Sequence, residues 1–386
     1  MKKFIGRLLV LAAVLMLAAV PAYADDTPSG TAIDSGITTY SLESGVYYLA
    51  EDITLPATIS IEIQRGNEVT IDLNGHTLTA SSTSVIQVGG KLTLVDSSAE
   101  QTGTITGGTY GITCSAFGGE VVMNGGTITG INGTSSGAAV SNSGTFTMNG
   151  GSITGNTGEW GGGVYNYGTF TMNGGTISNN TASDGSSLQN GGGVYVSGGT
   201  FTMNDGTITG CSAANGGGVY VSGGTFNLTG GTITDNITSE SGGGIYVGED
   251  VTFTMSGGTI TDNTAGTTGG GIHFEAKNGA AVTIAGGAIY ENTAQEDMGQ
   301  DVAIEVSSGD TATLTINSNV NSGIPGYDGW YEEQTKENYI DMAGTKAAGV
   351  SPYTNGIYLT APAGTVAKFY TRTLTLDGDI GVNYYV

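Results

Sequence analysis

The chain contains one pattern of apolar and small residues seven times, and this repetition restricts the folds open to it. The pattern runs approximately T-F-T-M-N-G-G-T-I-T-x-N-T-A, followed by a variable stretch and then G-G-G-V-Y-V-S-G. A repeat of this length is typical of a solenoid, in which each unit packs only on its neighbours. The first large apolar position returns every 24 to 31 residues, at Val121, Phe146, Phe170, Phe201, Phe226, Phe253 and Val282.

The repeat predicts strands rather than helices. Each unit contains three short runs in which apolar residues alternate with small or polar ones, for example Thr200–Met203 and Gly193–Val196. Alternation with a period of two indicates strands, and the Gly pairs and Asn between the runs indicate turns. We therefore predict an all-β fold, a right-handed single-stranded parallel β-helix of about ten coils with a C-terminal cap. Three strands per coil predict three parallel sheets, with strands about 4.8 Å apart.

An asparagine follows the second strand in most repeats. Stacked amides can hydrogen-bond from coil to coil, so this column predicts an asparagine ladder that Cys211 interrupts. A longer insertion at Ala182–Asn190 predicts a loop that stands off the rod. The column consists of Asn156, Asn180, Cys211, Asn236, Asn263 and Asn292.

The first 24 residues have the features of a secretory signal peptide. Lys2, Lys3 and Arg7 precede an apolar run, and the A-x-A site at 22–24 predicts a mature chain from Asp25. The alternative is an uncleaved membrane anchor. With cleavage, we predict a secreted or cell-surface protein that is not inserted in a membrane.

The remaining chain divides by how regular the repeat is. Residues 25–66 are expected to form an N-terminal cap with the first irregular strands, and residues 67–317 the β-helix. Residues 318–372 are expected to form an irregular C-terminal cap. Residues 373–386 have the pattern of strands, which either begin a truncated further domain or form a last capping hairpin.

The charge of the chain limits its partners. It has 34 acidic and 10 basic residues, and loss of the signal peptide changes the net charge from −24 to −27. No Lys or Arg occurs from residue 92 to residue 276. Nucleic acid is therefore excluded as a partner, and anionic polysaccharides are disfavoured unless divalent cations bridge them.

The two cysteines are not expected to form a disulfide. Cys114 aligns with the inward position of Val196, whereas Cys211 lies in the asparagine column. The two residues are about four coils apart, roughly 19 Å along the axis. A disulfide requires Cα atoms within about 7 Å. Both are predicted to be small buried residues.

The combination I-x-x-N-T-A followed by G-G-G-[VI] occurs at Ile177–Ala182 with Gly191–Val194, and again at Ile260–Ala265 with Gly269–Ile272. It resembles the right-handed parallel β-helix repeat proteins of bacterial surfaces, which have the pectin-lyase-like fold. It is similar to the polymorphic outer-membrane adhesins, although Ile replaces their Phe and Gly replaces their Ala. The segment Asp72–Leu78 also looks like adhesin-like proteins of gut Firmicutes. The resemblance implies a bacterial protein, secreted or at the cell surface, that adheres to glycans or proteins.

Polysaccharide lyases and hydrolases also have this fold, so a polysaccharide-degrading enzyme is an alternative. The regular coils lack the basic residue that pectate lyases use, and the motifs of polygalacturonases are absent. Asp235, Asp262 and Glu291 precede the ladder asparagine in consecutive coils, about 5 Å apart. Such carboxylates can hydrolyse glycosides, bind calcium with oxygen ligands, or form a solvated acidic edge. Calcium is the one cofactor that these residues suggest.

An aromatic column is predicted on the outer face of the third strand. Aromatic rings in such a column can stack on sugars, and Tyr hydroxyls add hydrogen bonds. The same rings can instead form a cross-strand ladder that stabilises the sheet. The column consists of Tyr165, Tyr195, Tyr220, Tyr246 and His273.

Together these features predict a non-catalytic β-helix that binds a polysaccharide or a surface protein through its repeat face. The alternatives are a polysaccharide hydrolase or lyase, and a structural spacer.

Overall fold

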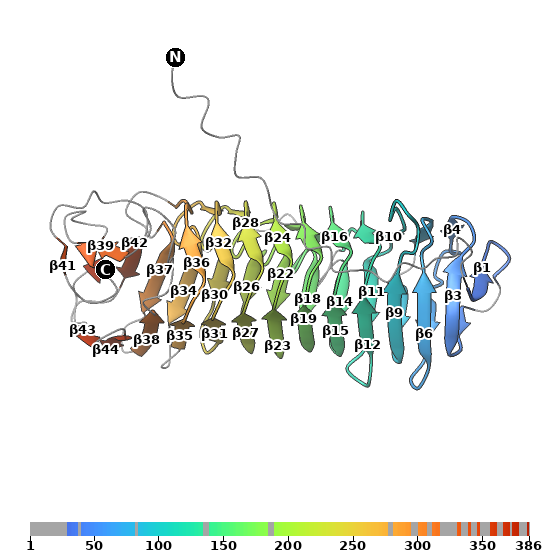
Figure 1. Ribbon diagram of the computed structural model, residues 1–386, viewed down its shortest axis with the longest axis horizontal. Coiled ribbons are helices and arrows are strands. Elements are labelled where there is room, and N and C mark those ends of the chain that lie inside the picture. Colours follow the sequence, from blue (N-terminus) through green and yellow to red (C-terminus); the bar gives the residue numbers. More distant parts are fainter. Residues whose placement is uncertain are drawn as a thin grey trace, which may run out of the picture.

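The computed structural model shows a rod of stacked coils (Figure 1). It describes residues 29–37, 40–81, 84–133, 139–183, 189–276, 281–294, 300–306 and 311–316, and seven short strands between 330 and 385. The proposed signal peptide lies outside the described residues. All described regular elements are strands, and successive coils pair in parallel, which confirms the predicted parallel β-helix.

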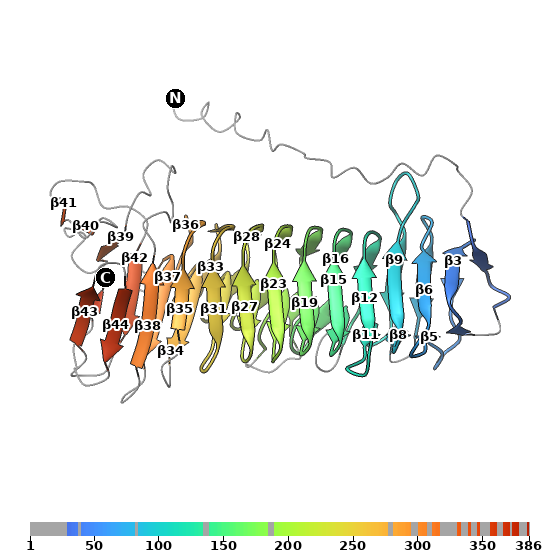
Figure 2. The same cartoon turned by 60° about the horizontal axis from the view of Figure 1, so that its bottom comes forward.

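Sheet A contains the strands with the T-F-T-M pattern, which lie side by side in Figure 2. Its strands pair in parallel from β1 to β38, and the antiparallel β44 and β43 continue it. In order, they are β1 (Thr31–Ile33), β3 (Gly45–Leu49), β6 (Glu68–Asp72), β9 (Lys91–Val95), β12 (Glu120–Met123), β15 (Thr145–Met148), β19 (Thr169–Met172), β23 (Thr200–Met203), β27 (Thr225–Leu228), β31 (Thr252–Met255), β35 (Ala281–Ile284), β38 (Thr311–Ile316), β44 (Thr373–Asp377) and β43 (Val366–Tyr370).

Sheet B contains the strands with the V-Y-V pattern. Parallel pairing runs from β2 to β42 and on to β39, and β40, β41 and β45 add antiparallel pairs. Its strands are β2 (Ser41–Leu42), β5 (Ile61–Ile63), β8 (Ser84–Val88), β11 (Tyr110–Cys114), β14 (Val140–Asn142), β18 (Val164–Asn166), β22 (Val194–Val196), β26 (Val219–Val221), β30 (Ile245–Val247), β34 (Ile272–Ala276), β37 (Val302–Val306), β42 (Gly356–Thr360), β39 (Trp330–Glu332), β40 (Tyr339–Ile340), β41 (Lys346–Ala347) and β45 (Tyr384–Tyr385).

Sheet C contains the T-I-T strands and has ten members, all parallel. They are β4 (Ile53–Thr54), β7 (Thr77–Ala80), β10 (Thr104–Gly107), β13 (Thr127–Thr129), β16 (Ser152–Thr154), β20 (Thr176–Ser178), β24 (Thr207–Thr209), β28 (Thr232–Thr234), β32 (Thr259–Thr261) and β36 (Ala288–Tyr290).

A fourth sheet, sheet D, corrects the expectation of three. It lies between sheets C and B in chain order, directly after the ladder asparagine, and its five strands have two residues each. Runs of two residues show no alternation, so the sequence pattern did not reveal them. The strands are β17 (Thr157–Gly158), β21 (Thr181–Ala182), β25 (Ser212–Ala213), β29 (Ile237–Thr238) and β33 (Thr264–Ala265).

Stacked apolar columns fill the core. The Phe side chains of sheet A are fully buried and in register, because each T-F-T-M strand pairs with its counterpart in the next coil. The ring centroids of Phe146 and Phe170 are 4.8 Å apart, and those of Phe170 and Phe201 are 4.6 Å apart, with nearly parallel planes. The predicted inward columns are therefore confirmed.

The predicted asparagine ladder is also confirmed. The Asn156 amide donates to Asn180 Oδ1 at 2.9 Å, and Asn236 donates to Asn263 in the same way. Cys211 interrupts the amide contacts, although its backbone N–H donates to Asn236 Oδ1. The last amide, on Asn292, donates to Asp301. Satisfying these buried amides from coil to coil fixes the register of the rod.

Candidate functional site

One continuous column of outward side chains runs along sheet B and contains the predicted aromatic residues. Each member lies between two inward positions of its strand, and each pairs with its counterpart in the next coil. We call it the sheet-B column; it consists of Glu62, Gln87, Thr113, Ser141, Tyr165, Tyr195, Tyr220, Tyr246 and His273.

The aromatic half of the sheet-B column is a stack of rings. Tyr165 and Tyr195 have ring centroids 5.5 Å apart, Tyr195 and Tyr220 5.2 Å, and Tyr220 and Tyr246 4.7 Å. The planes of each pair lie within 13° of parallel. Because the rings cover one another's faces, the inner tyrosines present mainly their edges. This geometry favours the cross-strand ladder, and a ligand-binding role for these rings stays a prediction.

Burial disfavours the ionised form of two tyrosines of the ladder. It raises the pKa of Tyr195, and it raises that of Tyr220 further with the help of the neighbouring Tyr195. His273 closes the stack at 4.7 Å from Tyr246 and is only 3% exposed, so it is not an accessible member of the column. Burial lowers the pKa of His273 to about 4, and its Nδ1 lies 2.8 Å from Thr268 Oγ1.

The other half of the sheet-B column forms the floor of a hollow of about 370 Å³. The column changes there from Tyr rings to the side chains of Ser, Thr, Gln and Glu, and the hollow lies over strands β5, β8, β11 and β14. The volume falls within the range of small-molecule sites. The hollow is lined by Glu62, Ile63, Gln64, Gln87, Val88, Gly89, Thr113, Cys114, Ser115, Ser141 and Ser143.

Two exposed aromatic side chains lie on the turns that lead from this region to sheet A. Phe117 is 80% exposed and follows Ser115, a lining residue, by two positions. Tyr167 is 60% exposed, and its backbone N–H donates to Asn142 O, next to the lining residue Ser143. The hollow, Phe117 and Tyr167 were not predicted from the sequence. The available signal was an aromatic residue in a turn where neighbouring repeats have Ser or Gly.

The acidic candidates occupy a turn. Asp235, Asp262 and Glu291 have φ angles of 55°, 56° and 56°, and Gly155 and Gly210 hold the equivalent position with φ of 64° and 62°. Asn, Asp and Gly tolerate this left-handed conformation better than other residues, so the turn itself explains the two aspartates.

Asp235 and Asp262 also accept hydrogen bonds from the threonine that precedes each of them. Thr234 Oγ1 donates to Asp235 Oδ2, and Thr261 Oγ1 donates to Asp262 Oδ2, both at 3.0 Å. Within the described part of the chain, no three His, Cys, Asp or Glu side chains gather as metal ligands do. Calcium binding and catalysis by these carboxylates stay predictions.

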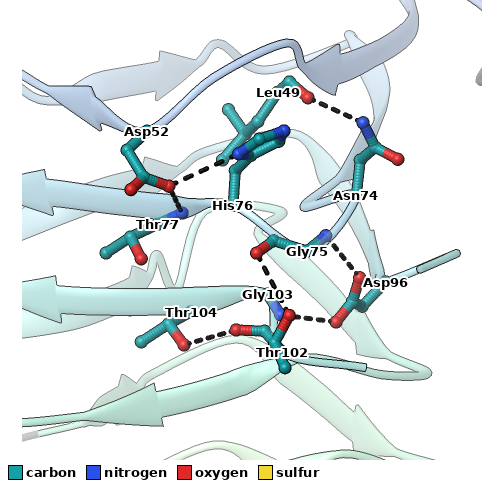
Figure 3. A network of polar contacts seen from close by, with 10 residues as sticks. All are labelled: Leu49, Asp52, Asn74, Gly75, His76, Thr77, Asp96, Thr102, Gly103 and Thr104. Atoms are coloured by element: carbon teal, nitrogen blue, oxygen red, sulfur yellow. Dashed lines mark hydrogen bonds and ion pairs between the residues drawn. The ribbon is translucent and has the colours of Figure 1, made fainter. Parts of the chain in front are cut away.

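His76 takes part in a polar network at the N-terminal end of the rod (Figure 3). Its Nδ1 lies 3.4 Å from Asp52 Oδ1, which also accepts the backbone N–H of Thr77. On the other side of the turn, Asp96 accepts the N–H groups of Gly75 and Gly103. The network holds the turn before β7 between its neighbouring coils, which is consistent with a structural histidine.

Cys114 and Cys211 are free and buried. Burial raises the pKa of each thiol to about 11. Thiolate is the reactive form of cysteine, so neither residue is suited to nucleophilic chemistry near neutral pH.

Comparisons with known protein families, with curated proteins and with solved structures gave no match. Among the described residues there is no helix long and apolar enough to cross a bilayer. The function of this chain is therefore inferred from its own sequence and geometry.

Proposed function

We propose that this chain is a secreted or cell-surface, non-catalytic β-helix protein that binds polysaccharide along the outer face of sheet B. The observation that carries the proposal is the polar hollow, which continues the column of the tyrosine ladder. A rod with one repeated face suits weak contacts made many times, because repetition raises the overall affinity. The resemblance of the repeat to bacterial adhesins supports the same role.

The composition of the hollow favours binding over catalysis. Glu62 is the one carboxylate among its lining residues. Glycoside hydrolysis requires a pair of carboxyl groups on opposite sides of the bond. Asp235, Asp262 and Glu291 are turn residues of coils far from the hollow, since the strands of those coils follow β14 by several positions in sheet B.

A glycan array tests the proposal. The mature chain, residues 25–386, should bind a limited set of polysaccharides. Repeating the array with calcium and with a chelator tests the proposed calcium contribution of the three carboxylates. A chain that binds no glycan in either condition would refute the proposal and favour a spacer or a protein partner.

The tyrosine ladder is tested by the double variant Tyr195→Ala with Tyr220→Ala. If ligands contact the ladder directly, this variant should lose glycan binding while its circular dichroism spectrum stays that of a β protein. Unchanged binding would limit the ladder to a structural role.

A further inference from the structure

The hollow differs chemically from the rest of the sheet-B column, which suggests a particular ligand. Four coils contribute to it, so its floor extends about 14 Å along the rod axis. The polar residues of its lining carry amide, hydroxyl and carboxylate groups: Glu62, Gln64, Gln87, Thr113, Ser115, Ser141 and Ser143. The apolar lining residues Ile63, Val88 and Cys114 are buried members of the core.

Hydroxyl and amide groups can both donate and accept hydrogen bonds. A floor of this kind matches a ligand rich in hydroxyl groups rather than an apolar peptide, which would need pockets for its side chains. Some groups of the floor already bond to the protein, as the Gln87 amide does to Ser60 Oγ at 3.2 Å. These bonds hold the side chains in place.

The edge of the hollow, here called the rim, carries an exposed aromatic side chain, which the polar floor does not provide. Among the described residues, four large apolar side chains are exposed, and one of them, Phe117, lies on a turn beside the hollow. The ring of Tyr167 lies instead against Gly198 of the following coil, on the side away from the hollow. Exposed aromatic faces can cover the C–H face of a sugar ring while hydroxyls bond to the floor. Polar floor and aromatic rim together match the two faces of a saccharide.

The charged residues in and beside the hollow restrict the class of ligand further. The lining contains one carboxylate, Glu62, and Arg65 lies on the adjoining turn. A Cβ placed on Gly118 would lie 3.9 Å from the Arg65 side chain, so the Phe117 turn and Arg65 are neighbours. One acid with one base nearby favours an uncharged ligand, and the net charge of −24 of the whole chain opposes an anionic one.

We propose that this hollow is a binding subsite for a short neutral oligosaccharide, laid along the rod axis with one of its rings against Phe117. The inference rests on the proposed polysaccharide binding and names its site and ligand class. It places the ligand beyond the last ring of the ladder, because Tyr165 pairs with Ser141 of the floor.

The test uses isothermal titration calorimetry on the mature chain with defined probes. The neutral probes are the hexasaccharides of β-1,4-linked glucose, xylose, mannose and N-acetylglucosamine. Hexagalacturonate and hexalysine are the charged probes. We expect at least one neutral probe to bind and both charged probes to bind at least ten times more weakly. Preferred binding of either charged probe would overturn the ligand class.

Variants locate the site. Thr113→Trp fills the floor, and Thr171→Trp makes the same change at a half-buried outward position of sheet A as a control. The rim variant Phe117→Ala removes only an exposed ring and should fold normally. We expect at least a tenfold loss of affinity in the floor and rim variants and none in the control.

The outcomes separate the two proposals. Full affinity in both the floor and rim variants, with glycan binding retained, would overturn the subsite while the proposed function stands. Loss of binding only in the Tyr195→Ala, Tyr220→Ala variant would do the same and assign binding to the ladder. No binding of any probe here and none on the glycan array would overturn both.

Discussion

Acid should weaken the rod at the coil that contains His273. This imidazole is 3% exposed and stacks on Tyr246, and burial lowers its pKa from 6.5 to about 4. Between these two pH values the unfolded chain binds a proton that the folded chain does not bind. The free energy of unfolding therefore falls as the pH falls from about 6.5 to about 4, and the loss is complete below 4.

The size of the effect follows from the shift. One pKa unit corresponds to 1.36 kcal/mol, so the histidine alone should cost about 3 kcal/mol between pH 7 and pH 4. Because the His273 imidazole is only 3% exposed, contact with solvent reduces this cost little. Its Nδ1 contact with Thr268 Oγ1 suits the neutral ring, in which one nitrogen donates and the other accepts.

Urea unfolding at pH 7 and pH 4 measures the loss. Acidic residues also titrate in this range, so the informative quantity is the difference between the wild type and His273→Tyr, which continues the ladder with the residue found in earlier coils. The wild type should lose about 3 kcal/mol more than this variant.

Equal losses in the wild type and His273→Tyr would refute the argument. So would an NMR titration in which the His273 imidazole changes protonation near pH 6.5. Should His273→Tyr strain the coil, His273→Gln removes the titration without adding volume, and the same comparison applies.

Further predictions concern the core, the ladder, the turns and the thiols. Phe201→Ala removes a fully buried ring from a stack and should lower the free energy of unfolding by about 3–5 kcal/mol, measured by urea denaturation. Asn236→Leu removes one amide of the ladder and leaves polar groups of its neighbours unsatisfied, so a loss of about 2 kcal/mol or more is expected in the same assay. Asp262→Gly should change stability by less than about 1 kcal/mol because Gly adopts its φ freely, whereas Asp262→Val should cost about 2 kcal/mol, and equal effects would contradict the turn argument. Cys114 and Cys211 should react with a thiol reagent at pH 8 only after denaturation; rapid labelling of the folded chain would show that they are accessible.

Much of the fold follows from the sequence because identical residues recur at the same point of each coil. Parallel, in-register stacking places Phe170 beside Phe201 and Asn236 beside Asn263, so the period alone predicts both contacts. The same logic predicted the alignment of Tyr195 with Tyr220. It did not show whether their ring faces would meet a ligand or one another, because ring spacing depends on side-chain rotamers rather than on register.

The hollow could not be predicted because it arises where the repeat weakens. Thr113 and Ser141 follow no strong pattern, and the turn that contains Phe117 is longer than the equivalent turn before β15. The left-handed φ of Asp262 was also hidden, since an acidic residue beside a strand suggests chemistry as readily as a turn. The hollow and the left-handed turn depend on residues that differ between coils. The predictions from the sequence depended on the residues that recur in every coil.

The direction of the strands has a mechanical consequence. Their interstrand hydrogen bonds, such as those between β19 and β23, join one coil to the next along the rod axis. A pull on the two ends of the rod therefore loads these bonds in series, and coils should peel away one at a time rather than break together. Each released coil of 24 to 31 residues adds about 80–100 Å of extended chain. A rod of this kind would lengthen stepwise under flow and dissipate force while its remaining coils stayed folded.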